Sequence, residues 1–316
     1  MKVIVTGATG FIGKHLLKKM SYRKDIFEEI VTMSRRPIIG NLGGSNAIKH
    51  YACDLSQTDA TACDYACMRR ICEKHKPDII FHLAANPITK LDNNRPSQII
   101  VDNVAATQNV VHYAPEGCRV VLASSVVVYG DWLYKQESTG RYNEEHQAKP
   151  TSIYGITKLA SEQIVSCYSD MDRINGVSLR LCATVGQGLT HGVIKDFILK
   201  LRYYDKLKVL GDHPGSTKPY AHIDDVTNVL IKMSLNDEKG EYNLVPDDEL
   251  NIEELAETVM RACGTKKEIE WLGEAANWKG DNRIIRVSNA KLKDWGWSPK
   301  YPTSKAAIFE TVRPYV

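Results

Sequence analysis

Tyr154 and Lys158 stand four residues apart in the segment Tyr-Gly-Ile-Thr-Lys. On a helix this spacing places a phenol and an ammonium group on one face, one turn apart. A nearby positive charge lowers the pKa of a tyrosine from its ordinary value of about 10. The phenol then serves as a general acid or base for an alcohol and ketone pair near neutral pH. A surface helix can carry the same spacing without any chemistry, so the motif needs partners elsewhere in the chain.

A hydroxyl group suited to cooperate with Tyr154 stands at the end of the apolar segment Arg119–Ser125, which is typical of a buried strand. Both Ser124 and Ser125 end this segment. A hydroxyl in such a position holds the substrate oxygen while Tyr154 moves the proton, and we assign this role to Ser125. Either serine would alternatively cap the end of the strand.

Three glycines spaced G-x-x-G-x-x-G (Gly7, Gly10 and Gly13) lie between a strand-like segment, Val3–Thr6, and a helical one, Phe11–Ser21. Glycine allows a tight turn and a close approach of the backbone to a pyrophosphate, and the N-terminus of the next helix offers free N–H groups to the anion. This context distinguishes the motif from a purely structural turn. It predicts a dinucleotide-binding site formed by Gly7, Gly10, Phe11, Ile12 and Gly13.

The end of the second predicted strand should lie beside the adenine ribose of the dinucleotide. A carboxylate recognises NAD there, but this chain has Ser34-Arg35-Arg36, whose hydroxyl and guanidinium groups suit the 2′-phosphate of NADP. The arginines would alternatively be solvated surface charges. After the third strand, Asp54 and Leu55 are predicted to line the cofactor site, with Asp54 either bonding the adenine amino group or capping the next helix.

Alternating apolar and helical segments around these motifs predict an α/β fold with a Rossmann-type, doubly wound parallel sheet and a smaller α/β C-terminal substrate lobe. We assign residues 1–182 to the cofactor domain and 183–316 mainly to the lobe, with some later segments returning to the first domain. The strands expected in the first domain are Val3–Thr6, Glu29–Ser34, Ile48–Cys53, Asp78–Leu83, Arg119–Ser125 and Val177–Leu181. The helices expected there are Phe11–Ser21, Thr61–His75, Ser97–Tyr113 and Thr151–Ser169. The helices expected later are Gly192–Tyr203, Asp224–Leu235, Ile252–Ala262, Ser288–Trp295 and Thr303–Val312, with strands at Lys208–Leu210 and Glu241–Val245.

The bulk composition excludes several classes of function. A net charge of +3, with acids and bases interspersed, provides no row of cations for nucleic-acid phosphates. No apolar stretch approaches the roughly 18 residues of a membrane span and no signal peptide is recognisable, so a cytoplasmic protein is expected. The eight cysteines form no C-x-x-C pair and no histidine cluster completes a metal site, so we expect free thiols and no metal.

The glycine loop, Ser125, Tyr154 and Lys158 together resemble those of the extended short-chain dehydrogenases/reductases. More narrowly, the chain is similar to the NAD-dependent epimerase/dehydratase family acting on nucleotide sugars, and the resemblance covers almost its whole length. Further landmarks of the resemblance are Phe81–Ala85, Asn103, Ser124–Gly130, His191–Ile194, Val209–Asp212, Tyr220–Asp225, Gly280–Asp281 and Leu292–Pro299.

The resemblance implies that Ser125, Tyr154 and Lys158 are the catalytic trio, with Asn86 and Ser125 at the substrate and its nucleotide in the second lobe. The residues expected at bound NAD or NADP are Leu83, Ala84, Ala85, Asn103, Tyr154 and Lys158. It also implies a homodimer packed through the two helices Ser97–Tyr113 and Thr151–Ser169. Apolar residues on these helices would equally suit packing against the sheet; they are Ile99, Ile100, Val110, Val111, Ile156, Leu159 and Ile164.

The reaction class depends on the two residues after the catalytic serine. The family's 4,6-dehydratases carry an Asp-Glu pair there to eliminate water, whereas this chain has Val126 and Val127, so dehydration is not expected. Two reactions remain: epimerisation, at C4 through a transient keto-sugar, and NADPH-dependent reduction of a nucleotide-linked 4-keto sugar or another small carbonyl compound. The C-terminal resemblance favours the epimerase, and Ser34-Arg35-Arg36 favours NADP and hence the reductase.

The substrate side departs from the family pattern. Alanine (Ala183) stands at the family's asparagine position, and Lys218 replaces the phosphate-binding arginine before the Tyr-x-His motif. A lysine meets a diphosphate as a point charge and not as a bidentate fork, or is simply an exposed loop residue. Trp278 and Lys279 stand where a second family arginine is expected, and Arg283, a few residues later, is the candidate substrate contact.

Two other classes of protein fit part of the pattern. A reductase of small non-nucleotide carbonyl compounds would bind no nucleoside diphosphate in its second lobe. A catalytically silent NADP sensor that regulates a partner protein would typically lack the tyrosine or lysine of the trio, and this chain has both.

Overall fold

A computed structural model of the chain describes residues 1–37, 48–57, 65–88, 95–130, 140–273 and 282–316. Within these residues the centre is a seven-stranded sheet in the order β10-β6-β5-β4-β1-β2-β3, and every neighbouring pair is parallel. The strands are β1 (Lys2–Thr6), β2 (Glu29–Ser34), β3 (Ile48–Ala52), β4 (Ile79–His82), β5 (Cys118–Ser125), β6 (Ile174–Leu181) and β10 (Gly240–Leu244). The order runs outward in both directions from β1 and β4, which confirms the predicted Rossmann-type, doubly wound parallel sheet.

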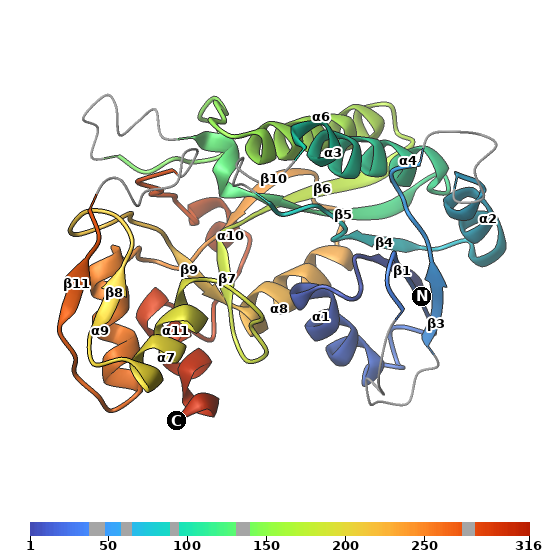
Figure 1. The fold of residues 1–316 in the computed structure, drawn as a ribbon. Helices are drawn as coiled ribbons and strands as arrows, with labels where there is room; N and C mark the ends of the chain where they lie inside the picture. Colours follow the sequence, from blue (N-terminus) through green and yellow to red (C-terminus); the bar gives the residue numbers. More distant parts are fainter. Residues whose placement is uncertain (38–47, 58–64, 89–94, 131–139, 274–281) are drawn as a thin grey trace.

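Helices cover both faces of this sheet because its central strands are apolar on both faces. These helices are α1 (Phe11–Ser21), α2 (Tyr65–His75), α3 (Pro96–Ile100), α4 (Ala106–Tyr113), α6 (Ile153–Asp170) and α8 (Ile223–Ser234). Along β1, Val3 and Val5 pack in one hydrophobic cluster with α1 and α8, whereas Ile4 packs in another with α2, α4 and α6. Figure 1 shows α1 and α8 below the sheet and α3, α4 and α6 above it.

A π-helical segment, η1 (Val101–Ala105), joins α3 to α4 into the continuous run predicted as Ser97–Tyr113. π-helical turns inside α-helices are frequent at functional sites. Here the turn carries Asp102 and Asn103, and both residues are buried.

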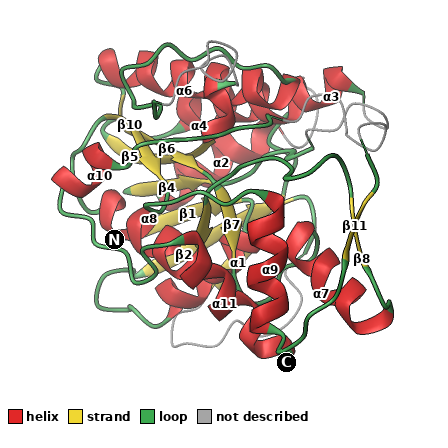
Figure 2. Cartoon of the chain, turned by 90° about the vertical axis from the view of Figure 1, so that its left-hand side faces the viewer, coloured by secondary structure: helices red, strands yellow, loops and turns green. Residues whose placement is uncertain are grey.

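The chain after residue 182 adds short strands and a separate hydrophobic cluster. Two parallel pairs form, β7 (Ala183–Val185) with β9 (Tyr220–His222) and β8 (Leu207–Val209) with β11 (Ile269–Trp271). The cluster packs α7 (Val193–Tyr203), α9 (Ile252–Ala262) and α11 (Ser304–Val312) together near the C-terminus (Figure 2). The short helix α10 (Ala290–Asp294) packs against β10. The strand pattern does not predict β7, β9 or β11, because three residues are too few to establish an alternation.

Candidate active site

Helix α6 positions Tyr154 and Lys158. The Ser152 hydroxyl caps its N-terminus by accepting a hydrogen bond of 3.1 Å from the Gly155 N–H. Lys158 Nζ lies 5.8 Å from the centroid of the Tyr154 ring and donates a hydrogen bond of 2.7 Å to the carbonyl of Ala123 on β5. Burial lowers the pKa of Lys158 to about 8, and the carboxylate of Glu162 acts in the opposite direction. The ammonium group is therefore held against the sheet, one turn from the phenol.

Ser125 ends β5 and begins the 3₁₀ turn η2 (Val126–Tyr129), where its hydroxyl accepts a hydrogen bond of 3.4 Å from the Val127 N–H. Burial raises the pKa of Tyr154 to about 12, opposed by a side-chain hydrogen bond with Ser125. The structure thus brings the predicted trio together at the carboxyl end of β5. The next side chains on the turn are the apolar Val126, which is buried, and Val127, so no carboxylate comes directly after the serine.

The glycine loop joins β1 to α1. Gly7 has φ +67°, and a Cβ atom there would lie 2.6 Å from the backbone nitrogen of Ala84, so only glycine fits between β1 and the end of β4. Gly10 is the N-cap of α1 and provides no side-chain hydrogen bond to the helix. The first N–H groups of the helix, including those of Phe11 and Ile12, thus lack a side-chain cap, which fits the binding of a dinucleotide pyrophosphate.

At the end of β2, the side chains of Ser34 and Arg35 form polar contacts with other groups of the protein. Ser34 is buried and donates a hydrogen bond of 2.7 Å to the carbonyl of Arg36. Arg35 lies 3.5 Å from the buried carboxylate of Asp102 but leaves 58% of its side chain exposed, and Arg36 is exposed. Both guanidinium groups are therefore accessible to an anion at this edge.

Asp54 and Leu55 come after β3 on the same side of the sheet. The Asp54 carboxylate accepts hydrogen bonds from the N–H and the hydroxyl of Ser56, at 3.1 and 2.7 Å. This closes a local turn, and residues 58–60 of the segment Ser56–Ala60, which Asp54 was alternatively predicted to cap, lie outside the described part of the chain. Leu55 is buried against the hydrophobic cluster on the α2 and α4 side.

The segment after β4 contains Leu83, Ala84, Ala85 and Asn86, all of them partly buried. The Asn86 N–H donates to Asn103 Oδ1 at 2.6 Å, and Asn103 Nδ2 donates both to the Asn86 carbonyl and to Thr157 Oγ1 on α6. The Asn103 amide is therefore used to hold the end of β4 against the helix of the trio. The side chain of Asn86 donates to Asp102 at 3.0 Å.

Lys218 and Arg283 come from different parts of the C-terminal region but lie on paired backbone segments. The Thr217 N–H donates to the Arg283 carbonyl at 2.7 Å, and the Ile285 N–H donates to the Thr217 carbonyl at 2.9 Å. Thr151, three residues before Tyr154, donates to Asn282 at 2.7 Å and thereby ties this segment to the start of α6. Arg283 is exposed and Lys218 half-buried. Gly280, Asp281, Trp278 and Lys279 lie outside the described residues.

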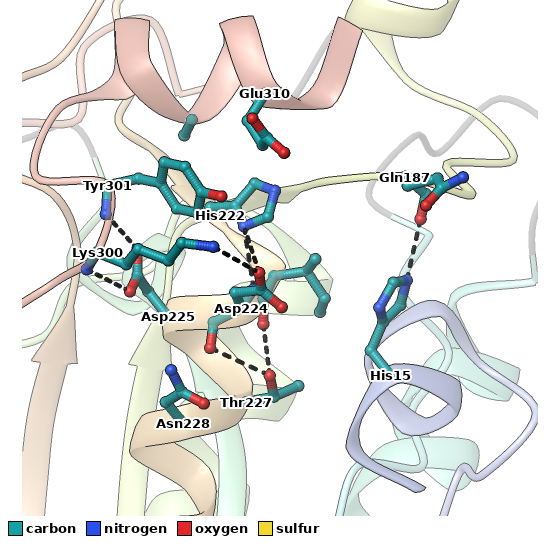
Figure 3. Close-up of polar contacts among 12 residues, drawn as sticks. His15, Gln187, His222, Asp224, Asp225, Thr227, Asn228, Lys300, Tyr301 and Glu310 are labelled. Atoms are coloured by element: carbon teal, nitrogen blue, oxygen red, sulfur yellow. Dashed lines mark hydrogen bonds and ion pairs between the residues drawn. The ribbon is translucent and has the colours of Figure 1, made fainter. Parts of the chain in front are cut away.

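The landmark Tyr220–Asp225 joins the C-terminal region to α1. Asp224 lies 3.2 Å from the ammonium of Lys19 and 3.7 Å from that of Lys300. Asp225 accepts the backbone N–H of Lys300 at 2.7 Å, as Figure 3 shows beside the Asp224 contacts with His222 and Lys300. These carboxylates bind groups of the protein itself, so the landmark serves to hold the lobe against the cofactor domain.

Sequence patterns did not single out Glu162 and Arg180, which form a buried ion pair behind the trio with an N–O distance of 2.8 Å. The signal that reveals Arg180 is a charge inside the apolar strand Val177–Leu181, because a buried charge requires a partner. Among the described residues there is no cluster of metal ligands, every described cysteine is free, and no helix has the length and apolarity needed to cross a membrane.

Known proteins share both the sequence pattern and the fold. The model of the NAD dependent epimerase/dehydratase family matches residues 3–245. UDP-glucuronic acid decarboxylase 6 of Arabidopsis thaliana is 27% identical over 311 residues, which cover 95% of this chain and 84% of that protein. The dTDP-D-glucose 4,6-dehydratase of Homo sapiens is 24% identical over 322 residues, 99% of this chain and 89% of that protein.

Among solved structures, a UDP-galactose 4-epimerase superposes with a TM-score of 0.79 at 27% identity, covering 100% of this chain and 98% of the other. The family match spans most of the chain, and the fold agrees with it. The chain therefore belongs to the NAD-dependent epimerase/dehydratase family and is an enzyme of the extended short-chain dehydrogenase/reductase type.

Proposed function

We propose that the enzyme inverts C4 of a nucleotide sugar by removing a hydride and returning it to the opposite face of a transient keto-sugar. The observation that carries the proposal is the assembly of Ser125, Tyr154 and Lys158 at the end of β5, with valines and not carboxylates at the next two positions. This arrangement supports alcohol–ketone interconversion and lacks the acid and base that elimination of water requires.

Bound NAD or NADP supplies the hydride acceptor and donor at C4. The Ser125 hydroxyl binds the O4 oxygen of the sugar, and Tyr154 Oη takes the O4 proton as the hydride leaves and returns it in the second half of the reaction. The ammonium of Lys158 stabilises the phenolate, which burial alone would disfavour. Catalysis therefore requires that the positive charge of Lys158 lie beside Tyr154.

The substrate nucleotide is assigned to the C-terminal lobe, residues 183–316 apart from those that return to the sheet. Lys218 and Arg283 supply the cations for its diphosphate, and Asn86 contacts the sugar from the end of β4. Support for the cationic pair comes from the backbone bonds that place both segments next to the start of α6.

For the cofactor we propose that NADP binds at least as well as NAD. Support comes from Arg35 and Arg36, whose exposed guanidinium groups stand at the end of β2. The same feature favours the second candidate function, an NADPH-dependent reductase of a nucleotide-linked 4-keto sugar or another small carbonyl compound. The two candidates differ in whether NADPH is consumed.

We further propose a homodimer packed through α3–α4 and α6. Of the apolar residues on these helices, Val110 and Val111 are buried in a hydrophobic cluster with the sheet and Ile99 is also buried, whereas Ile100 and Ile156 are 45% and 48% exposed. Light scattering on the purified protein should give twice the mass of one chain, and the mass of one chain would refute the dimer.

The test of the proposed function begins with denaturing the purified protein and identifying the released nucleotide by mass spectrometry. A stoichiometric dinucleotide, followed by C4 inversion of a UDP- or GDP-sugar without added cofactor, is the expected result. Release of CO₂ from UDP-glucuronate would instead indicate decarboxylation. An empty protein that oxidises NADPH with a keto-sugar would establish the reductase.

A further inference from the structure

A buried ionic network lies directly behind the proposed catalytic trio. Glu162 of α6 is fully buried, and Arg180 of β6 is 4% exposed. Arg180 donates from Nε to Glu162 Oε1 at 3.0 Å and from a terminal nitrogen to Oε2 at 2.8 Å. Its other terminal nitrogen donates to the hydroxyl of Tyr129 at 2.8 Å, and this hydroxyl donates to Asn243 at 2.9 Å.

Two hydrogen bonds join α6 to the end of β5, one from the network and one from the trio. Ser124, the neighbour of Ser125, donates to Glu162 Oε1 at 2.5 Å. One turn earlier on α6, Lys158 donates to the carbonyl of Ala123 at 2.7 Å. Successive residues of β5 are therefore fastened to successive turns of α6, and Ser125 is the next residue along the strand.

Stability alone does not account for this pair. Removing two charges from water costs several kcal/mol per ion, and apolar residues of similar volume often serve a buried site equally well or better. Hydrogen bonds to Ser124 and Tyr129 satisfy the remaining polar atoms of the pair. The pair also lies beside the end of β5, where the catalytic residues are proposed. The two elements that the pair connects, β5 and α6, are the elements that contain the trio.

The charged and titratable groups that interact with Lys158 come from two elements. Tyr154 and Glu162 lie on α6, and His82 lies on β4. Burial and the charge of Lys158 lower the pKa of His82 to about 3, so its ring is neutral. Among the described residues, Glu162 is then the anion that acts on the Lys158 ammonium.

We propose that Glu162 and Arg180 are positioning residues of the active site: together they fasten the end of β5 to α6, so that Ser125 meets Tyr154, and the Glu162 carboxylate, one turn after Lys158 on the same face of α6, serves as its counter-charge. The inference deepens the proposed function and rests on the roles given there to the trio. Glu162 and Arg180 themselves touch neither substrate nor cofactor.

The charge arm of the proposal is tested by the ionisation of Lys158 in the full-length protein. Acylation of Lys158 by a small anhydride, followed by peptide mass spectrometry across a pH series, gives the midpoint at which the free amine appears. In Glu162→Gln this midpoint should fall by about 1 pH unit, because the ammonium loses its counter-charge. Arg119→Lys is the matched control: this buried arginine stands at the opposite end of β5, bonded to Met233 and Asn175, and its variant should keep the midpoint.

Where Glu162→Gln does not fold, the double variant Glu162→Gln/Arg180→Gln leaves no unpaired buried charge, and its midpoint should fall by less than in the single variant, because a cation is removed together with the anion. Ser124→Ala tests the fastening separately: the midpoint should stay, while kcat falls about tenfold at unchanged KM because Ser125 is no longer aligned. An unchanged midpoint in both Glu162 variants would overturn the charge arm, and an unchanged kcat in Ser124→Ala would overturn the fastening.

The acylation midpoint requires neither sugar nor cofactor. If the wild-type protein turns over no nucleotide sugar but the midpoint falls in Glu162→Gln, the proposed function is refuted and the role of Glu162 is supported. If the wild-type protein turns over a nucleotide sugar but the midpoint does not change in Glu162→Gln, the proposed function is supported and the role of Glu162 is refuted.

Discussion

The carboxyl edge of the sheet and the C-terminal lobe hold their polar groups in different ways. At the sheet edge, Lys158 and Asn103 are buried and bonded to neighbouring strands and helices. In the lobe, Lys218 and Arg283 stand on segments joined by isolated bridges, and Arg283 is exposed. The difference predicts that substitutions at the proposed catalytic residues disturb the fold more than substitutions at the proposed diphosphate contacts Lys218 and Arg283.

The largest expected effect is on turnover and results from loss of the phenol. Tyr154→Phe should lower kcat about 1000-fold while leaving dinucleotide binding in place, because only the proton transfer is removed. Tyr168→Phe is the control on the same helix, where the hydroxyl accepts a hydrogen bond from Gln108. Initial rates with equal enzyme loading measure both, and a Tyr154→Phe variant that retained full activity would remove Tyr154 from the mechanism.

The second prediction compares the free energy of unfolding lost on substituting two glycines with nearly equal φ, one at the sheet edge and one in the lobe. A methyl group added at Gly7 (φ +67°) would lie 2.6 Å from the Ala84 backbone nitrogen, whereas one added at Gly264 (φ +64°) would have nothing within 4 Å. Gly264→Ala should cost about 1–2 kcal/mol from the left-handed backbone alone. Gly7→Ala should cost about 2 kcal/mol more from overpacking and should abolish dinucleotide binding. Urea unfolding of both variants gives the comparison, and equal losses would show that the approach of Gly7 to β4 is not tight.

Acid sensitivity should arise at the sheet edge. The folded-state pKa of His82 is about 3, whereas the unfolded chain titrates at about 6.5. Between these values the unfolded state binds the proton and the folded state does not, so the free energy of unfolding falls as the pH falls. From about pH 7 to about pH 5 the loss should be about 2 kcal/mol. His82→Gln should reduce that loss in urea unfolding, and an identical pH dependence would contradict it.

The smallest effects are expected in the lobe. Lys218→Met and Arg283→Met should each raise KM about tenfold with kcat unchanged, because each removes one charge contact to a diphosphate that is bound equally in the ground and transition states. Lys206→Met, which removes a surface ion pair with Glu268, should leave both constants unchanged. A fall in kcat without a change in KM would place these cations at the reacting centre instead.

The sequence-based predictions were most successful where the fold itself requires a particular residue type or pattern. The glycine loop between a strand and a helix and the continuous apolar strands are typical of one fold, and the parallel sheet and helix α1 appear as predicted. The π turn inside the predicted helix was not foreseen; two of its residues, Asp102 and Asn103, form hydrogen bonds with Asn86 after the end of β4.

The buried pair of Glu162 and Arg180 also lay beyond the sequence patterns. Glu162 lies on α6 and Arg180 on β6, 18 residues later in the sequence. Each buried charge is tolerated only because the packing of α6 on β6 brings the two together. Three-residue strands such as β7 and β9 carry too little alternation to be distinguished from loops. The roles of Lys218 and Arg283 remain predictions, because a half-buried lysine and an exposed arginine carry no apolar pattern that marks them as substrate contacts.

The central claim, that a hydride leaves C4 and returns to the other face, is tested most directly with a nucleotide sugar deuterated at C4. The purified enzyme is incubated with this sugar and no added cofactor, and the product is analysed by NMR and mass spectrometry. We expect a C4-inverted sugar that retains its deuterium, because the label passes to the bound dinucleotide and back. Deuterium found in free NADP(H), or a sugar whose C4 configuration is unchanged, would contradict the claim.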